Sequence, residues 1–196
     1  MLCCRAVMLC VVLVMGGVQC QNIEDQQTPS SGVSVGSCSK TVVLDKNFDN
    51  TRFSGTWYKI GGLPTTEEIS VNCTKYEYIQ TATGYSVDAT GVDINNSPTQ
   101  QNSVLRQQES NIGRFNTKLS QIEADIAVIN TDYDNYACLH SCYDIKEAFH
   151  VQQAWIISRT RQPSRDHIAL CQKALFEVGV PIRLLEKVHQ GSECTN

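Results

Sequence analysis

The chain has 196 residues, with 16 basic and 20 acidic side chains, so its formal net charge at pH 7 is −4. This mild acidity, spread without blocks of like charge, argues against a surface that binds phosphates and therefore against nucleic acid as a partner. The residues that follow the N-terminal apolar segment suit one domain in number.

The first segment, residues 1–20, has the composition of a secretory signal peptide. Arg5 supplies a positive charge, and the uncharged apolar run from Ala6 to Met15 is shorter than the about 20 residues that a membrane span needs. We expect cleavage after Cys20 or Gln19 and therefore a secreted, extracellular protein. An N-terminal membrane anchor is the alternative, and no later stretch is apolar enough to span a membrane.

A polar arm is predicted over residues 21–37, and a single domain over residues 38–196. In the domain, short β-type runs alternate with turn residues, a pattern that is typical of an all-β sandwich or barrel. The clearest runs are Thr56–Ile60, Cys73–Gln80, Ile126–Tyr133, Tyr136–Tyr143 and Phe149–Arg159.

The region from Asn95 to Asn111 is dominated by Gln, Asn and Ser, and its strands are only weakly indicated. Alternation of apolar and polar residues favours strands at Val104–Arg106 and Phe115–Leu119.

One helix is predicted over Arg165–Val178, where Ile168, Cys171, Leu175 and Val178 share one face. Ser164 is the expected N-cap, and Gly179 is the expected left-handed stop, with Pro181 after it.

The cysteines outside the leader are even in number: Cys38, Cys73, Cys138, Cys142, Cys171 and Cys194. An even count behind a signal peptide predicts disulfides. A zinc site would need closely spaced cysteine pairs of the C-x2-C type, which are absent, so we expect no metal. Cys138 and Cys142 lie about 13 Å apart on one strand, too far to bond each other. Fifteen connectivities exist for six cysteines, and the residues alone do not choose among them.

Three motifs follow one another in the domain: NFDNTRFSGTWYKI at 47–60, TDYDNYA at 131–137 and FHVQQAWIISRTR at 149–161. In their order and spacing they resemble the lipocalin family, in particular apolipoprotein D and the arthropod bilin- and carotenoid-binding members, including the crustacyanins. The resemblance implies an all-β fold: an eight-stranded up-and-down antiparallel β-barrel with one C-terminal α-helix packed on its outside.

The resemblance also implies structural roles for Gly55, Trp57, Thr131, Asp132, Tyr133 and Arg159. Arg159 should lie across the Trp57 ring at the barrel floor, a contact worth about 0.5–2 kcal/mol. The disulfide pairing implied by likeness to the crustacyanins is Cys38–Cys142, Cys73–Cys194 and Cys138–Cys171.

The implied pairing orients two strands. If Cys138, His140 and Cys142 face outward, Leu139 and Tyr143 face the cavity. The reach of Arg159 to the floor places Gln153 and Trp155 on the inward face as well. Tyr78 matches a pocket tyrosine of apolipoprotein D. We therefore expect a ligand site lined by Tyr78, Leu139, Tyr143, Gln153 and Trp155; the alternative is that some of these side chains only fill a narrow eight-stranded barrel.

These features favour a carrier that transports a small hydrophobic ligand: a lipid, steroid, bilin or carotenoid. We expect no catalysis and no cofactor, because every cysteine of the domain can be assigned to a bridge and the histidines (His140, His150, His167 and His189) form no visible constellation. The alternatives are a crustacyanin-like subunit that acts through association, as a homo- or heterodimer, and a lipocalin-type isomerase. Two sequons, at Asn72 and Asn95, predict a glycoprotein.

Overall fold

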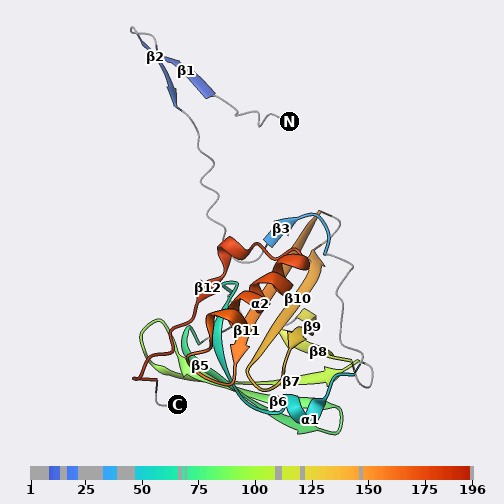
Figure 1. Ribbon diagram of the computed structural model, residues 1–196. Helices are drawn as coiled ribbons and strands as arrows, with labels where there is room; N and C mark the ends of the chain where they lie inside the picture. Colours follow the sequence, from blue (N-terminus) through green and yellow to red (C-terminus); the bar gives the residue numbers. More distant parts are fainter. Residues whose placement is uncertain are drawn as a thin grey trace.

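The computed structural model describes residues 9–13, 17–21, 33–38, 47–65, 68, 70–108, 112–119, 122–145 and 148–194. Eight consecutive antiparallel strands form a closed barrel, and one main helix covers part of its outer wall (Figure 1). The predicted fold class is therefore confirmed.

The barrel strands follow the chain in order, each antiparallel to the one before it. They are β4 (Gly55–Gly62), β5 (Asn72–Thr81), β6 (Gly84–Val92), β7 (Pro98–Gln107), β8 (Arg114–Leu119), β9 (Ile122–Thr131), β10 (Tyr136–Ile145) and β11 (Phe149–Ser158). Pairing of β11 with β4 closes the ring, with Trp155 opposite Gly62.

Gly62 allows this closure because the two backbones approach too closely for a side chain. A Cβ atom at Gly62 would lie 2.2 Å from the carbonyl oxygen of Ala154. Glycine is the residue that permits such an approach.

Among the described residues, four further strands lie outside the barrel. β3 (Val33–Val35) continues the sheet beyond β11, and β12 (Glu186–Lys187) pairs with β4. β3 falls in the stretch where a flexible arm was expected. β1 (Leu9–Leu13) and β2 (Gly17–Gln21) pair only with each other among the described strands, in the segment whose removal as a signal peptide stays a prediction. None of the described helices is long and apolar enough to cross a membrane.

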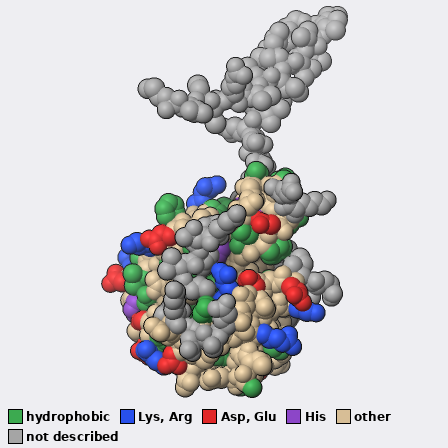
Figure 2. Space-filling view, turned by 90° about the vertical axis from the view of Figure 1, so that its right-hand side faces the viewer, with side chains coloured by type: hydrophobic (Ala, Val, Ile, Leu, Met, Phe, Trp, Pro, Cys, Tyr) green, Lys and Arg blue, Asp and Glu red, His purple; other side chains and the backbone are tan. Residues whose placement is uncertain are grey.

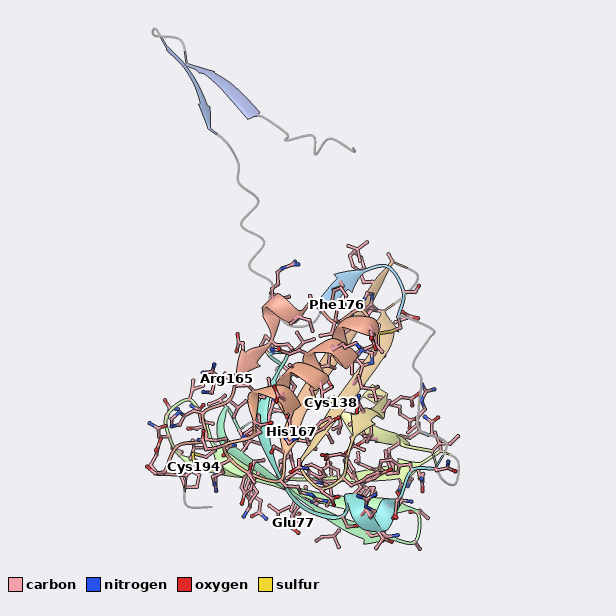
Figure 3. The ribbon with its side chains drawn as sticks, viewed as in Figure 1. Glu77, Cys138, Arg165, His167, Phe176 and Cys194 are labelled. Carbon is pink, nitrogen blue, oxygen red and sulfur yellow. A yellow bond between two sulfur atoms is a disulfide. The ribbon has the colours of Figure 1, made fainter. Side chains whose placement is uncertain are left out.

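The helix α2 (Arg165–Glu177) begins at the predicted residue and ends one residue before the expected Val178. The Ser164 hydroxyl accepts a hydrogen bond from the His167 backbone N–H, and Gly179 has a φ of +90°. Cys171 and Leu175 are fully buried against the outer wall, where Cys138 of β10 lies beneath the helix (Figure 3). Two short helices, α1 (Asn50–Phe53) and η1 (Ile182–Leu184), complete the described helices.

Three strands differ from the expectation. The whole of β6 was missed, and β7 spans ten residues where only Val104–Arg106 was indicated. The run expected to end at Tyr133 ends at Thr131, because Tyr133 has a φ of +67° and lies in the turn.

The seam between β7 and β8 is poorly paired. Only Arg106–Asn116 and Gln107–Phe115 are opposite each other, and the described residues beyond them on the two strands, from Leu105 and Thr117 onward, are not paired with each other. The two strands therefore separate on the side away from Gln107.

The surface mixes charges and exposed apolar groups. Figure 2 shows basic and acidic side chains interspersed over one face, so neither sign dominates there. Phe176, near the end of α2, is 70% exposed (Figure 3). Other large exposed hydrophobic side chains lie on neighbouring strands at one end of the molecule, namely Val33, Val35, Ile145 and Phe149.

Candidate functional site

The barrel floor is built around Trp57 and Arg159. The guanidinium carbon of Arg159 lies 3.7 Å from the centroid of the Trp57 ring, which is the stacking that the resemblance implies. Arg159 also donates hydrogen bonds to the carbonyl oxygens of Tyr133 (3.0 Å), Thr56 (2.9 Å) and Arg52 (2.7 Å). One side chain thus joins α1, β4 and the β9–β10 turn.

The turn from Thr131 to Tyr136 holds the floor from the other side. The Asp132 carboxylate accepts hydrogen bonds from the backbone N–H groups of Asp134, Asn135 and Tyr136. Partial burial opposes ionisation, but hydrogen bonds from Asn135 and Tyr136 prevail and lower the pKa of Asp132. The Thr131 hydroxyl donates to the Tyr136 carbonyl at 2.7 Å.

Gly55 begins β4 with a φ of +94°, and a Cβ atom there would lie 3.5 Å from Nη1 of Arg159. The left-handed backbone favours glycine at this position. All six residues that the resemblance marks as structural therefore lie at or beside the floor.

Aromatic side chains fill the lower half of the barrel. Phe53, Tyr85 and Phe115 are each at most 1% exposed, and Tyr85 packs on both Phe53 and Phe115. The Tyr85 hydroxyl donates to the Asn50 carbonyl at 2.8 Å. This filling confines free space to the half of the barrel away from α1.

The free space is a cavity of about 110 Å³. Four of the five predicted lining residues border it: Tyr78, Leu139, Gln153 and Trp155. Tyr143 is not among the residues that border the cavity, and its contact with a ligand stays a prediction. Tyr143 is on the inward-facing side of β10, but it pairs with Val151, farther from the floor than Ser141 and Gln153, and is only partly buried.

Sequence reasoning missed a polar cluster on the cavity wall. Glu68, in the connection between β4 and β5, forms an ion pair with Lys59 of β4. Its other carboxylate oxygen accepts hydrogen bonds from the Tyr76 hydroxyl and from Nε1 of Trp155, the latter at 2.9 Å. Glu68 could not be found from the sequence, because it lies in an irregular connection that has no periodic pattern. The inward position of Lys59, two residues after Trp57, follows from strand alternation.

The two tyrosines of the wall keep their protons. Burial, followed by the negative charge of Glu68, raises the pKa of Tyr76 well above 10.0 and raises that of Tyr78 as well. Tyr76 is therefore a neutral hydrogen-bond donor at physiological pH.

The remaining wall is partly polar. Gln153 donates from Nε2 to the Thr65 hydroxyl at 3.2 Å, and its Oε1 is buried without a hydrogen bond from the described residues. Gln101 and Ser103 of β7 also border the cavity, which places part of the Gln/Asn/Ser-rich region in the wall.

The structure contains three disulfides, Cys38–Cys142, Cys73–Cys194 and Cys138–Cys171. They are the pairs that the resemblance implies. Among the described residues, one group, His189, Glu193 and Cys194, has ligand atoms close enough for a metal. Cys194 is bonded to Cys73, so the thiolate that a metal would need is not available.

The histidines are dispersed. His140 is buried on the outer wall, where Gln152 connects it to His150, and His167 stacks on Tyr136. His189 pairs with Glu193 near the C-terminus. These positions provide no base beside the cavity.

The two sequons differ in their surroundings. Asn95 is exposed in the β6–β7 turn, whereas the side-chain oxygen of Asn72 accepts a hydrogen bond from the His189 backbone. Their glycosylation stays a prediction.

Known proteins resemble this chain in sequence. The Crustacyanin-A1 subunit of Homarus gammarus is 24% identical over 143 residues, which cover 72% of this chain and 79% of the relative. Apolipoprotein D of Macaca fascicularis is 28% identical over 167 residues, covering 80% of this chain and 84% of the relative.

Solved structures share the fold. Lobster apocrustacyanin A1 superposes with a TM-score of 0.74 at 23% identity, covering 84% of this chain and 94% of the other. Insecticyanin from the tobacco hornworm Manduca sexta has a TM-score of 0.70, also at 23% identity, covering 84% and 92%.

The comparison with family profiles agrees with the three motifs and with the barrel. Residues 54–190, from the start of β4 to beyond η1, match the profile described as "Lipocalin / cytosolic fatty-acid binding protein family". This chain belongs to the lipocalin family.

Proposed function

We propose that this lipocalin is a secreted carrier that binds a small hydrophobic or amphipathic ligand in the barrel cavity and transports it. The observation that carries the proposal is the cavity itself. Leu139, Ile157 and the ring of Trp155 give it apolar walls, while a few polar groups are available to orient a ligand. Small-molecule sites in proteins have this composition.

Secretion is supported by two features. The leader has a charged start and a short apolar run. The domain contains three disulfides, and such bonds persist in oxidising compartments.

A carrier fits the chain better than the isomerase alternative. An isomerase that uses a cysteine in the cavity as its nucleophile needs an unpaired thiolate there. Cys38, Cys73, Cys138, Cys142, Cys171 and Cys194 are all disulfide-bonded.

Native mass spectrometry tests the carrier proposal. The wild-type protein, incubated with a lipid extract and desalted, should retain a bound small molecule. Leu139→Trp, which fills the cavity, should retain none, because the added ring occupies the ligand volume. Val104→Trp is the matched control, since Val104 is 44% exposed on β7. A wild-type protein that stays empty after every extract would contradict the proposal.

Association with a second chain is a separate question. The relative from Homarus gammarus is named a subunit, and this supports a test of assembly. Analytical ultracentrifugation of the protein with and without a captured ligand distinguishes a monomeric carrier from a subunit whose assembly depends on ligand.

A further inference from the structure

Glu68 has hydrogen-bonding capacity to spare on the cavity wall. Its Oε1 accepts from Tyr76 and Trp155, and its Oε2 is paired with Lys59. An ionised carboxylate offers about four acceptor sites, so three donors leave at least one site open. The Glu68 side chain is 19% exposed, whereas that of Lys59 is 7% exposed, so the acid is the more accessible partner.

Gln153, which borders the same cavity, holds a second acceptor that lacks a partner in the described part of the chain. The residue is 4% exposed, and its Oε1 accepts no hydrogen bond from the described residues. A buried acceptor without a partner is unfavourable, because the hydrogen bonds that it loses to water are not replaced. A donor on a ligand would remove that cost.

The charges around the cavity disfavour an acidic group at this end. The nearby cation, Lys59, is already paired with Glu68. Lys118, the cation that borders the cavity among the described residues, is exposed, so it can meet a carboxylate only at the rim. An anionic head placed beside Glu68 would therefore face a like charge with little compensation.

An apolar surface lies beyond the cavity toward solvent, past the polar pair of Ser141 and Gln153 on the same face. Leu139, Gln153 and Trp155 border the cavity, and the inward face of β10 and β11 continues past them. The residues of that face and of the adjoining β3 form the mouth patch, defined as Val33, Val35, Tyr143, Ile145, Phe149 and Val151. In Figure 1, β3 and the β10–β11 hairpin project at the end of the molecule away from α1.

Four residues of the mouth patch are exposed, and the other two, Tyr143 and Val151, are partly buried. Val35 is 83% exposed, Phe149 47% and Ile145 41%, and Phe149 is opposite both of the others in the sheet. Isolated exposed hydrophobic side chains need no explanation, but a contiguous row often marks a binding surface.

The size of the cavity connects these observations. Its volume of about 110 Å³ is below the roughly 300–1,000 Å³ of pockets that enclose drug-sized ligands. A head group and a few carbon atoms fill it, and a longer chain must leave through the mouth, where the patch offers apolar contact.

We propose that the protein binds a single-chain amphiphile with its amino or hydroxyl head held inside by Glu68 and Gln153 and its hydrocarbon chain lying along the mouth patch. The inference rests on the proposed carrier function and names the ligand chemistry for the same cavity.

Three probes with the same chain and different heads test the head group. Octylamine, octan-1-ol and octanoate are titrated at pH 7.5, with binding followed by calorimetry and by Trp155 fluorescence. The amine and the alcohol should bind about tenfold or more tightly than octanoate, because the site's acceptors pair with donors and not with a carboxylate. Octanoate binding as tightly as octylamine would overturn the inference.

Variants assign the effect to residues. Glu68→Gln should weaken octylamine by about tenfold and change octan-1-ol much less, whereas Glu177→Gln, an exposed glutamate of α2, should change neither. Because Glu68→Gln leaves Lys59 without its partner, a urea midpoint accompanies each titration. Gln153→Leu keeps that ion pair and should weaken octan-1-ol, so the inference stays testable if Glu68→Gln does not fold. Unchanged head preference in both variants would refute the assignment.

Chain length tests the mouth patch. Affinity for the wild type should rise steadily from butylamine to dodecylamine, and Phe149→Ser should flatten the rise for the longer chains only. An unchanged slope would refute the path along the patch. If no probe of any head or length binds, the carrier function fails as well, whereas binding with the wrong head preference refutes this inference alone.

Discussion

Replacing Arg159 should loosen the barrel floor more than replacing any other cation that stacks on a ring in the described structure. Arg159 lies over Trp57 and donates three hydrogen bonds to backbone carbonyl oxygens. Each bond contributes about 1 kcal/mol net in a partly exposed setting, and the ring contact adds about 1 kcal/mol. Arg159→Ala should therefore lower the free energy of unfolding by about 4 kcal/mol.

Arg159→Lys separates charge from geometry. Lysine keeps the positive charge but cannot reproduce the planar fork, so it should lose about 2–3 kcal/mol. The control is Arg52→Ala, because Arg52 also lies over a ring, that of Tyr133, but its side chain is 49% exposed. It should cost about 1 kcal/mol or less.

Urea unfolding with the disulfides intact, followed by tryptophan fluorescence, measures all three variants. A loss below about 1 kcal/mol for Arg159→Ala, which is the level expected of a surface pair, would refute the reasoning. If Arg159→Lys has the same free energy of unfolding as the wild type, the role given to the planar guanidinium fork is refuted. Either result would mean that aromatic packing alone holds the floor.

Three further perturbations have defined outcomes. Replacing Cys138 and Cys171 by serine opens a loop with a sequence separation of 33, and the chain-entropy relation gives a loss of about 3–4 kcal/mol in urea unfolding. Burial lowers the pKa of His140 from 6.5, so below pH 6.5 the unfolded chain takes up a proton that the folded chain resists. The free energy of unfolding should therefore fall as the pH drops below 6.5. His140→Gln should reduce the slope of this dependence between pH 8 and pH 5. A flat profile in the wild type would contradict this. Gly62→Ala forces a Cβ to 2.2 Å from the Ala154 carbonyl, so it should lower the melting temperature by several degrees or prevent folding, and an unchanged melting temperature would show that the closure yields easily.

The parts that could be predicted from sequence are those governed by short-range rules or by specific motifs. Ser164 and Gly179 mark the ends of α2 through capping chemistry. Trp57 and Arg159 belong to motifs whose spacing is specific to the barrel. Alternation then placed Leu139 and Trp155 on the inward face.

The parts that could not be predicted depend on where the barrel ends and on connections without periodicity. Tyr143 is on the face expected for it, but β10 continues beyond the cavity, and alternation says nothing of depth. Glu68 comes from an irregular connection, and its role exists only because Lys59 and Trp155 meet it there. The strand β6, with the sequence GYSVDATGV, is a different case: Tyr85, Val87 and Ala89 alternate toward the core, so the period-2 pattern of a strand is present in its sequence and this strand could have been predicted.

The seam between β7 and β8 has a mechanical consequence. Its two residue pairs lie at the end near Phe115, so the rest of the seam has no ladder of hydrogen bonds to hold it at a fixed width. The wall can therefore yield there at a lower cost than at the fully paired β10–β11 seam. Amide hydrogens on the facing edges of Val104 and Lys118 should exchange with solvent faster than those of β10. The barrel is thus a stiff shell with one compliant side.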